Sequence, residues 1–150
     1  MARLLGSIPG GEAAAEDWVR QLVLRVAIGD NDLHAKNVSL LHLPGGTRLA
    51  PVYDAVPNFF QEGLVTWDMA LAVDGVFDHR RMSVERLVAE TVSWGVLPIG
   101  PGPGLVGETV NDLAAVLDSV PVPDGVSPRM ADHVRRNVDR LRTGYEIGEP

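Results

Sequence analysis

The sequence predicts a mainly helical domain that carries one small β-hairpin. Apolar residues recur at three- and four-residue spacing along much of the chain, which is typical of amphipathic helices. Two short strand-like segments in the first third of the chain flank a turn signal. The length of 150 residues, with 45% hydrophobic and 22% charged residues, fits one globular domain or a large part of one.

The first helix is predicted over residues 12–28, after a flexible lead-in at residues 1–10. Acids near the N-terminal end of this helix favour its dipole, and Gly29 supplies the usual C-terminal signal. Residues 22–28 are apolar apart from Arg25, so we expect the helix to be central and buried. The domain is expected to span residues 11–145, with a short tail at 146–150.

A β-hairpin is predicted directly after this helix and the polar loop that follows it. Residues 38–43 and 47–52 have the apolar character of strands and flank Pro44-Gly45-Gly46, a credible hairpin turn. Asp54 lies just beyond the second of these strands, where an exposed acid is expected.

The remainder of the chain is expected to be helical, including the short apolar stretch at 66–73. Ser83 is a candidate cap for the next helix, which Gly95 and Pro98 would end. An apolar stripe at 106–120 predicts a further helix. Ser127 before Pro128 is a cap followed by proline at the first helical position, which predicts the start of the last helix.

Bulk composition argues against several classes of function. The sequence has no cysteine, which excludes disulfides and thiolate metal sites and fits a cytoplasmic protein. Its net charge of −7 argues against direct nucleic-acid binding, which normally needs clustered lysine and arginine. No apolar run is long enough to span a membrane, and the N-terminus is too short and broken for a signal peptide, so we expect no membrane association.

The most informative segment is the polar run Gly29-Asp30-Asn31-Asp32-Leu33-His34-Ala35-Lys36-Asn37. It places a carboxylate, an imidazole, an ammonium group and a carboxamide between apolar flanks. Lys36 is the one lysine in a chain that has twelve arginines. Because the two cations are not interchangeable, this bias favours a role for the compact charge of Lys36.

Phosphoryl transfer from ATP needs an acid that orients the attacking hydroxyl and oxygen ligands that hold magnesium against the phosphates. Asp32 is followed by Asn37 five residues later and by Asp54 after the hairpin, which is the order of these groups in kinase-like sites. We expect the two polar loops to meet at neighbouring strand ends. Lys36 is then placed to offset phosphate charge, whereas His34 is expected to brace the loop.

The segments Gly29–Ser39 and Leu49–Asp54 closely resemble the C-terminal domain of HipA-type serine/threonine kinases, the toxins of bacterial toxin–antitoxin modules that induce persistence. The resemblance covers about residues 15–142 and continues through Met69–Phe77 and the helix after Ser83. It implies a protein-kinase-like C-lobe that uses ATP and Mg²⁺ to phosphorylate a protein serine or threonine, with aminoacyl-tRNA synthetases as known targets. The usual partner in the family is a small helix-turn-helix antitoxin.

The resemblance also implies a role for each residue of the motif. Asp32 matches the catalytic acid that orients the substrate hydroxyl, and Lys36 matches the motif lysine near the phosphates. Asn37 and Asp54 match the magnesium ligands. His34, which we group with Asn37 and Asp54 as cofactor-binding, matches the structural histidine of the loop.

The sequence departs from a whole kinase in one respect. A kinase also has an N-lobe, with a phosphate-covering loop and a strand lysine, but only 31 residues precede Asp32 and Lys36 is the sole lysine. We therefore expect a C-lobe alone: a truncated gene, an expressed fragment, or one subunit of a split kinase that is weak or inactive by itself. The alternative is a non-catalytic remnant that binds an antitoxin, a nucleotide or a separate N-lobe.

Plainer interpretations exist for the motifs. The polar run can be a loop whose Asp and Asn side chains only serve turns. An EF-hand is argued against by Ala35 and Leu41, which stand where the calcium loop needs Gly and Glu. Gly102–Gly107 matches the pattern G-x-G-x-x-G, but prolines rather than a strand precede it, so we expect an inter-helix loop.

The remaining polar residues are expected at the surface. The histidines outside the motif show no ligand spacing and are assigned to surface or hairpin positions: His42, His79 and His133. Residues 78–81 are expected to form a solvated turn. Four arginines near the C-terminus are expected on a solvated helix face, with partner docking as the alternative: Arg135, Arg136, Arg140 and Arg142. The three tryptophans are expected in the core or in a groove wall.

Overall fold

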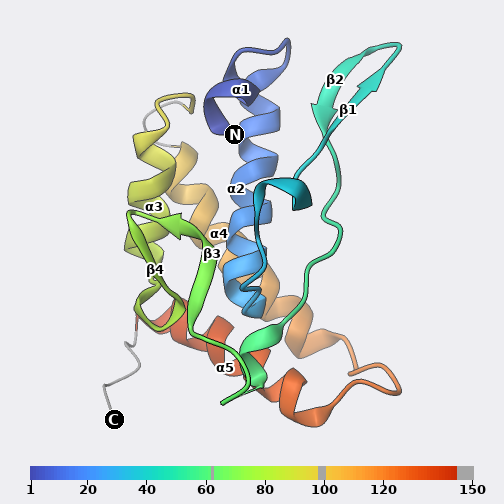
Figure 1. The fold of residues 1–150 in the computed structure, drawn as a ribbon, viewed down its shortest axis with the longest axis vertical. Coiled ribbons are helices and arrows are strands. Elements are labelled where there is room, and N and C mark those ends of the chain that lie inside the picture. The colour runs from blue at the N-terminus through green and yellow to red at the C-terminus, as the bar shows by residue number, and fades with distance from the viewer. Residues whose placement is uncertain (62, 98–100, 145–150) are drawn as a thin grey trace.

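The computed structural model describes residues 1–61, 63–97 and 101–144. This part of the chain is mainly helical, with two small antiparallel hairpins (Figure 1). The helices are α1 (Ala2–Gly6), α2 (Gly11–Ile28), α3 (Val84–Ser93), α4 (Pro101–Ser119) and α5 (Pro128–Thr143). The hairpins pair β1 (Leu40–Leu43) with β2 (Gly46–Leu49), and β3 (Asp68–Val73) with β4 (Val76–Asp78). Short 3-10 turns are η1 (Ala35–Asn37), η2 (Asn58–Phe60) and η3 (His79–Arg81).

α2 is the central helix of the fold, as the sequence predicts. α1, α4 and α5 pack against it, and it runs through the middle of the molecule in Figure 1. Trp18, Leu22 and Val26 are among its many buried side chains, so most of its circumference faces the core. The helix ends at Gly29, whose φ of +79° is a left-handed conformation that glycine adopts without strain.

The prediction of an unstructured lead-in at residues 1–10 is wrong where α1 forms. Leu5 is fully buried and Ala2 nearly so, as parts of the same core as α2. A helix this short has little stability of its own, so apolar burial against α2 stabilises it. The junction is tight: a Cβ on Gly11 would lie 2.3 Å from the Leu5 carbonyl oxygen, which makes glycine necessary there.

The first hairpin lies where it was predicted, but its strands are shorter than the predicted ones at 38–43 and 47–52. Leu43 of β1 stands opposite Gly46 of β2, so the turn itself consists of Pro44 and Gly45. Pairing ends at Leu40 and Leu49, and the chain then leaves β2 toward Asp54 without further strand. The hairpin therefore separates the polar loop in sequence from the acid that follows it.

The helical prediction for residues 66–73 is wrong, because this segment contributes β3 of a second hairpin. Asp74 and Gly75 connect the strands, with φ of +51° and +71°. Positive φ at both central residues is what a type I′ hairpin turn requires, and Asp-Gly is a strong signal for that turn. Met69 and Val73 are buried while Ala70 and Leu71 are exposed, so the strand buries only part of its surface in the core.

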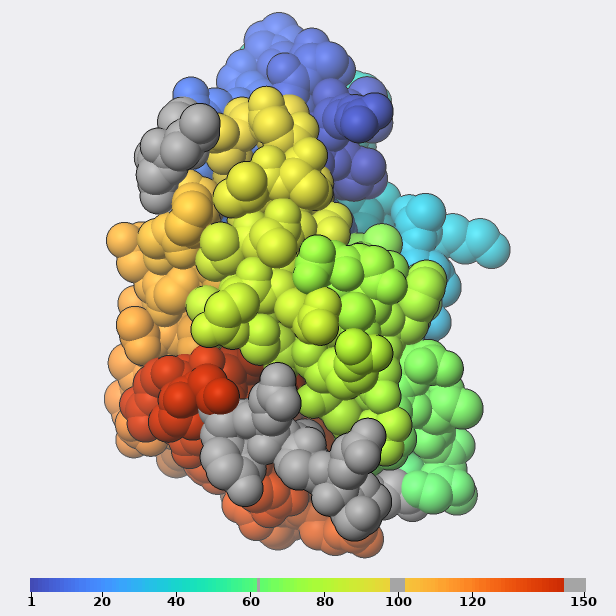
Figure 2. All heavy atoms as spheres, turned by 90° about the vertical axis from the view of Figure 1, so that its left-hand side faces the viewer, coloured from blue at the N-terminus to red at the C-terminus, as the bar shows by residue number. Residues whose placement is uncertain are grey.

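The later helices begin mostly where the sequence predicts. Ser83 Oγ accepts a hydrogen bond from the Arg86 backbone N–H (3.4 Å), and α5 starts at Pro128 after Ser127. Figure 2 shows α3 at the centre of one face, with α4 on one side and the second hairpin on the other. The stop signal expected at Pro98 lies outside the described residues. Over the described chain, none of the helices has the length and hydrophobicity that a membrane crossing requires.

The expected inter-helix loop at Gly102–Gly107 is instead the first part of α4. Leu105 and Val106 are buried in the core, and this burial outweighs the low helix propensity of the glycines. Because the segment is helical, it is not the loop of a dinucleotide fingerprint.

Candidate functional site

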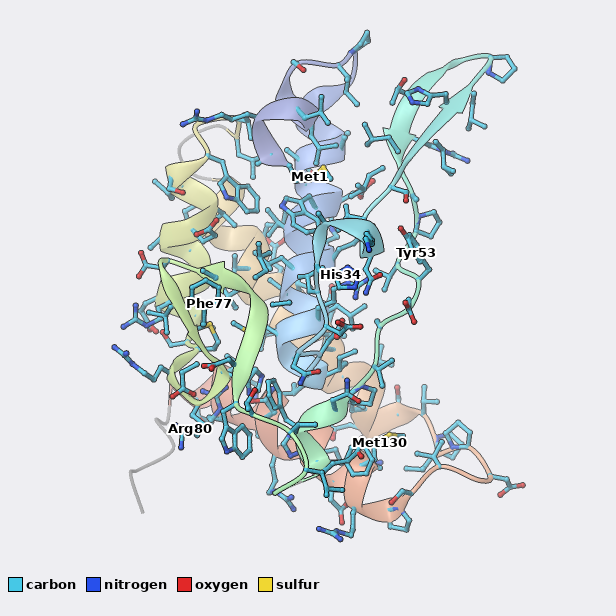
Figure 3. All side chains as sticks on the ribbon, viewed as in Figure 1. Met1, His34, Tyr53, Phe77, Arg80 and Met130 are labelled. Carbon is cyan, nitrogen blue, oxygen red and sulfur yellow. The ribbon has the colours of Figure 1, made fainter. Side chains whose placement is uncertain are left out.

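One buried arginine joins the two polar loops. Arg25 lies in the last turns of α2 and is 0% exposed. Its Nη2 donates to the carbonyl oxygens of Asn37 (3.1 Å) and Tyr53 (2.7 Å), and its Nη1 donates to that of Asp54 (3.4 Å). The loop after α2 and the loop after β2 therefore meet at a single guanidinium group. In Figure 3 the labelled residues His34 and Tyr53 mark these two loops.

Asp30 neutralises the buried arginine. The side chains of Arg25 and Asp30 are both 0% exposed, and Arg25 Nη1 donates to Asp30 Oδ2. The other carboxylate oxygen, Oδ1, accepts the backbone N–H of Asp32 (2.9 Å). Removing one partner of such a pair leaves an uncompensated buried charge, which is strongly destabilising. Asp30 therefore connects the guanidinium group to the main chain of the polar loop.

The main chain of Asp32 is held from both sides while its carboxylate faces solvent. Its carbonyl oxygen accepts hydrogen bonds from the His34 backbone N–H (2.8 Å) and from Asn37 Nδ2 (2.8 Å). The Asp32 side chain is 57% exposed, and its Oδ1 lies 3.6 Å from His34 Nε2. This arrangement presents a carboxylate to an incoming group on a fixed backbone. His34 lies beside that carboxylate.

The second loop is attached to the first by a tyrosine. The Tyr53 hydroxyl donates to the Lys36 carbonyl oxygen (2.7 Å), and its oxygen lies 2.6 Å from Ser39 Oγ. The next residue, Asp54, is exposed and has φ of +52°, a conformation that Asp adopts more readily than most residues. Backbone strain of this kind clusters at functional sites. The side chain of Lys36 is exposed as well.

Asn37 and Asp54 carry oxygen donors of the kind that a magnesium ion would accept. Asn37 is 4% exposed, and its Nδ2 is engaged by the Asp32 carbonyl, which turns Oδ1 the opposite way. This Oδ1 and the Asp54 carboxylate are oxygen ligands of the type that Mg²⁺ prefers. Among the described residues no group of three or more His, Asp or Glu could hold a metal ion. Mg²⁺ is commonly held by one or two carboxylates with phosphates and water, so this pair is adequate chemistry for it.

The segment after Asp54 returns to the polar loop. Asn58 Nδ2 donates to Asn31 Oδ1 (2.8 Å), and the Asn58 backbone N–H donates to the Gly29 carbonyl oxygen (3.0 Å). Pro57 also forms an isolated antiparallel bridge with Asp30. The polar loop is therefore bounded on one side by the Arg25 junction and on the other by η2.

A buried polar network anchors the end of α2 and corrects two expectations. His79 was expected at a surface or hairpin position, but it is 1% exposed. It stacks on Phe59 (centroids 4.4 Å apart) and places Nε2 2.8 Å from the Val26 carbonyl oxygen. Asn137 Nδ2 donates to the carbonyl oxygens of Val26 (2.9 Å) and Ala27 (2.8 Å). Burial lowers the pKa of His79 to about 4, so the ring is neutral at pH 7. Residues 78–81 are thus only partly the solvated turn that was expected.

Arg140 is the second correction, because it lies inside rather than on a solvated helix face. It is 8% exposed and donates to Asn137 Oδ1 from Nη2 (2.7 Å) and Nε (3.1 Å), and to the Met82 carbonyl oxygen from Nη1. Burial lowers the pKa of its guanidinium group. Sequence alone gave no signal for this burial, because Arg140 resembles the exposed arginines around it.

Comparisons with known proteins identify the family and the fold of the chain. A family model described as the HipA-like C-terminal domain matches residues 1–120. The chain belongs to this family. A search of curated proteins finds no match. Among solved structures, the chain is similar to a chain of the Shewanella oneidensis MR-1 toxin–antitoxin complex of HipA, HipB and operator DNA, with a TM-score of 0.63 and 22% identity. The match covers 95% of this chain and 37% of the other, so this chain spans about a third of that relative's length.

The HipA assignment confirms the resemblance seen in the sequence. At 22% identity the Shewanella structure shows a shared fold. The described residues therefore form a HipA-like C-terminal domain of mainly helical architecture with two small hairpins.

Proposed function

We propose that this HipA-like domain contributes the hydroxyl-orienting acid and the magnesium ligands of an ATP-dependent protein serine/threonine kinase. The observation that supports the proposal is the Arg25 junction, which brings the loop containing Asp32 and Asn37 next to the loop containing Asp54. Sequence order alone does not require these loops to touch. Their meeting is what a shared metal and nucleotide site needs. We also propose that the fold of this domain corresponds to the C-lobe of protein kinases.

In this function each polar side chain of the loops has one role. The exposed Asp32 carboxylate accepts a hydrogen bond from the substrate serine or threonine and takes its proton as the hydroxyl attacks. His34 keeps that carboxylate in place, and the Lys36 ammonium offsets charge on the transferred phosphoryl group. Asn37 Oδ1 and the Asp54 carboxylate would hold Mg²⁺. When bound, the ion would neutralise charge on the ATP phosphates.

Other parts of the reaction need groups that these 150 residues do not supply. Lys36 is the one lysine of the chain, so a separate lysine that grips the α- and β-phosphates has no candidate here. We propose that a HipA-like N-lobe, in the same or a second polypeptide, provides it. Because the Shewanella relative was solved with HipB, a helix-turn-helix antitoxin is the proposed protein partner. The proposed location of the protein is the cytoplasm. An aminoacyl-tRNA synthetase is the proposed class of substrate.

Metal binding can be tested on the chain alone. We expect Mn²⁺, used as a paramagnetic substitute for Mg²⁺, to broaden backbone amide NMR signals at residues 30–38 and 53–58 together. Asp54→Ala should remove that broadening, and Asp112→Ala, which removes an exposed acid of α4, should leave it unchanged. Broadening that spreads over unrelated surface acids, or affects only one of the loops, would contradict a shared site.

Phosphotransfer is tested in an assembly that includes a HipA-like N-lobe. We expect Asp32→Asn to abolish transfer from radiolabelled ATP to protein while circular dichroism and antitoxin binding stay unchanged. Asp17→Asn, at an exposed acid of α2, is the matched control. If the parent assembly binds the antitoxin but shows neither metal binding nor transfer, the alternative of a non-catalytic binding module replaces this proposal. Full activity in Asp32→Asn would show that Asp32 is not the acid that orients the substrate hydroxyl.

A further inference from the structure

Tyr53 is held at both of its ends. Its carbonyl oxygen accepts a hydrogen bond from Arg25 Nη2 (2.7 Å), and its hydroxyl oxygen lies 2.7 Å from the Lys36 carbonyl oxygen and 2.6 Å from Ser39 Oγ. Figure 3 shows Tyr53 on the loop after β2, beside the polar loop that is marked by His34. The residue therefore joins the two loops through its main chain and through its side chain.

The direction of each hydrogen bond at the Tyr53 hydroxyl follows from the chemistry of its partners. A carbonyl oxygen can only accept, so the single hydroxyl proton of Tyr53 is donated to the Lys36 carbonyl. The phenol oxygen is then an acceptor toward Ser39, whose own hydroxyl must donate. Ser39, Tyr53 and Lys36 thus form one directed chain of hydrogen bonds, which connects the second loop to two positions of the first.

This chain of hydrogen bonds lies next to both proposed magnesium ligands. Lys36 immediately precedes Asn37, and Tyr53 immediately precedes Asp54. Mg²⁺ demands near-ideal octahedral geometry, with oxygen ligands at about 2.0–2.1 Å. A small displacement of one loop relative to the other would therefore weaken binding of the ion.

The main chain at Asp54 also needs support from its surroundings. Its φ of +52° is a sparsely populated conformation for a residue with a side chain, and such a conformation persists where the surrounding structure over-determines it. Arg25, which is 0% exposed, holds this main chain from inside the fold through the carbonyl oxygens of Tyr53 and Asp54. The hydroxyl of Tyr53, a residue that is 39% exposed, adds an attachment at the surface. Two attachments restrict rotation of the loop, whereas one would permit it.

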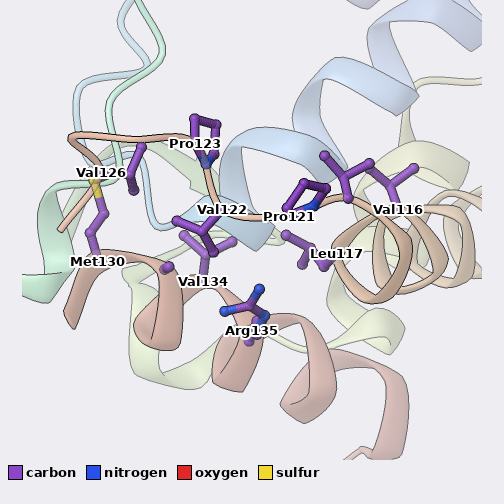
Figure 4. Close-up of a pocket in the computed structure, with 11 residues that line it drawn as sticks. Val116, Leu117, Pro121, Val122, Pro123, Val126, Met130, Val134 and Arg135 are labelled. Atoms are coloured by element: carbon purple, nitrogen blue, oxygen red, sulfur yellow. The ribbon is translucent and has the colours of Figure 1, made fainter. Parts of the chain in front are cut away.

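The hollows around α5 do not contribute to this arrangement. The apolar groove between the end of α4 and the start of α5 (Figure 4) contains no residue of either loop, and the same holds for the two polar hollows beside α5. The spacing of the two loops is therefore set by the hydrogen bonds between them and by the Arg25 junction.

We infer that the Tyr53 hydroxyl is a positioning group that sets the spacing between Asn37 and Asp54, and through it the affinity of the site for a divalent cation. The inference rests on the proposed function, because these two residues are the proposed metal ligands. Tyr53 acts through them and is not itself a ligand, since its proton is donated to the Lys36 carbonyl. The net worth of one neutral hydrogen bond corresponds to about twofold to tenfold in an equilibrium constant.

Tyr53→Phe tests the inference because it removes one oxygen atom and keeps the ring. Titration of the full chain with Mn²⁺, followed by electron paramagnetic resonance, should show a dissociation constant raised by about twofold to tenfold. Ser39→Ala leaves the bond to the Lys36 carbonyl in place and should have a smaller effect. Thr47→Val is the matched control, since it removes a hydroxyl that lies 2.9 Å from His42 Nδ1 within the first hairpin, and it should leave the affinity unchanged.

A measurement without metal separates this inference from the proposed function. In Tyr53→Phe, amide hydrogen exchange at Asn37 should become faster, while exchange at Leu22 in α2 and the circular dichroism spectrum stay unchanged. If the parent chain binds Mn²⁺ and Tyr53→Phe changes the affinity by less than about twofold, the inference is overturned and the proposed function stands. Unchanged exchange at Asn37, or an equal loss of affinity in Thr47→Val, has the same consequence. A parent chain that binds no Mn²⁺ contradicts both.

Discussion

Replacing Arg25 by methionine is expected to destabilise the folded chain by about 3–5 kcal/mol. Methionine keeps much of the apolar stem but removes the guanidinium group, which leaves the Asp30 carboxylate, 0% exposed, without its partner. Breaking a buried ion pair from one side has this magnitude because the remaining charge is desolvated and uncompensated. Three backbone carbonyl oxygens lose a donor as well. The predicted loss is a large fraction of the 5–15 kcal/mol that stabilises a typical domain.

Urea unfolding followed by circular dichroism measures this loss, and a double variant identifies its cause. Asp30→Asn keeps an oxygen that accepts the Asp32 backbone N–H but removes the charge. Arg25→Met with Asp30→Asn should therefore recover about 2 kcal/mol or more relative to Arg25→Met alone, since the buried charge is gone. The reasoning is refuted if Arg25→Met changes the free energy of unfolding by less than about 1 kcal/mol, or if the double variant is less stable than Arg25→Met.

Three further predictions use the same unfolding measurement. Gly29→Ala should cost about 1–3 kcal/mol, because φ is +79° and the new Cβ would lie 3.2 Å from His133 Nε2 and 3.3 Å from Phe59; no loss would contradict the tight packing there. Since burial lowers the pKa of His79 from 6.5 to about 4, the unfolded state binds more protons in that window, and stability should fall by up to about 3 kcal/mol as pH drops from 6.5 to 4. His79→Gln should remove that part of the pH dependence, and an unchanged slope would assign it to carboxylates. Leu87→Ala should cost about 2–5 kcal/mol, as Leu87 is fully buried in α3; a cost below about 1 kcal/mol would show that the core collapses around it.

The sequence predicted an element correctly where its local signals agree with the packing of that element in the fold. α2 has an apolar pattern and a glycine stop, α5 has Ser127 before Pro128, and the first hairpin has glycines at its turn. The polar loop was identified because its residue types and spacing are unusual in themselves. Asp54, across the hairpin, was selected by the same chemical reasoning; the structure brings its loop to the polar loop, and its role as a metal ligand stays a prediction.

What the sequence left undetermined depends on contacts between distant segments. His79 and Arg140 are buried because each finds a partner more than 50 residues away, at Val26 and Met82 respectively. The role of Arg25 had a usable sign, since a lone charge within an apolar helix implies a buried partner, but nothing identified its three carbonyl acceptors. The second hairpin is a different case. Asp74-Gly75 is a local signal for a hairpin turn, but it was overlooked because the apolar stretch before it was interpreted as a helix.

The Arg25 junction contacts only main-chain oxygens at the second loop. Its assembly therefore does not use the Asp54 carboxylate, and a change to Asn or Gly, residues that tolerate the φ of +52° there, would delete a charge and leave the junction intact. A homologue without the Asp54 carboxylate would keep the same fold and the same surface for partner proteins. Among relatives of this domain, persistence of shape is thus poor evidence for persistence of catalysis.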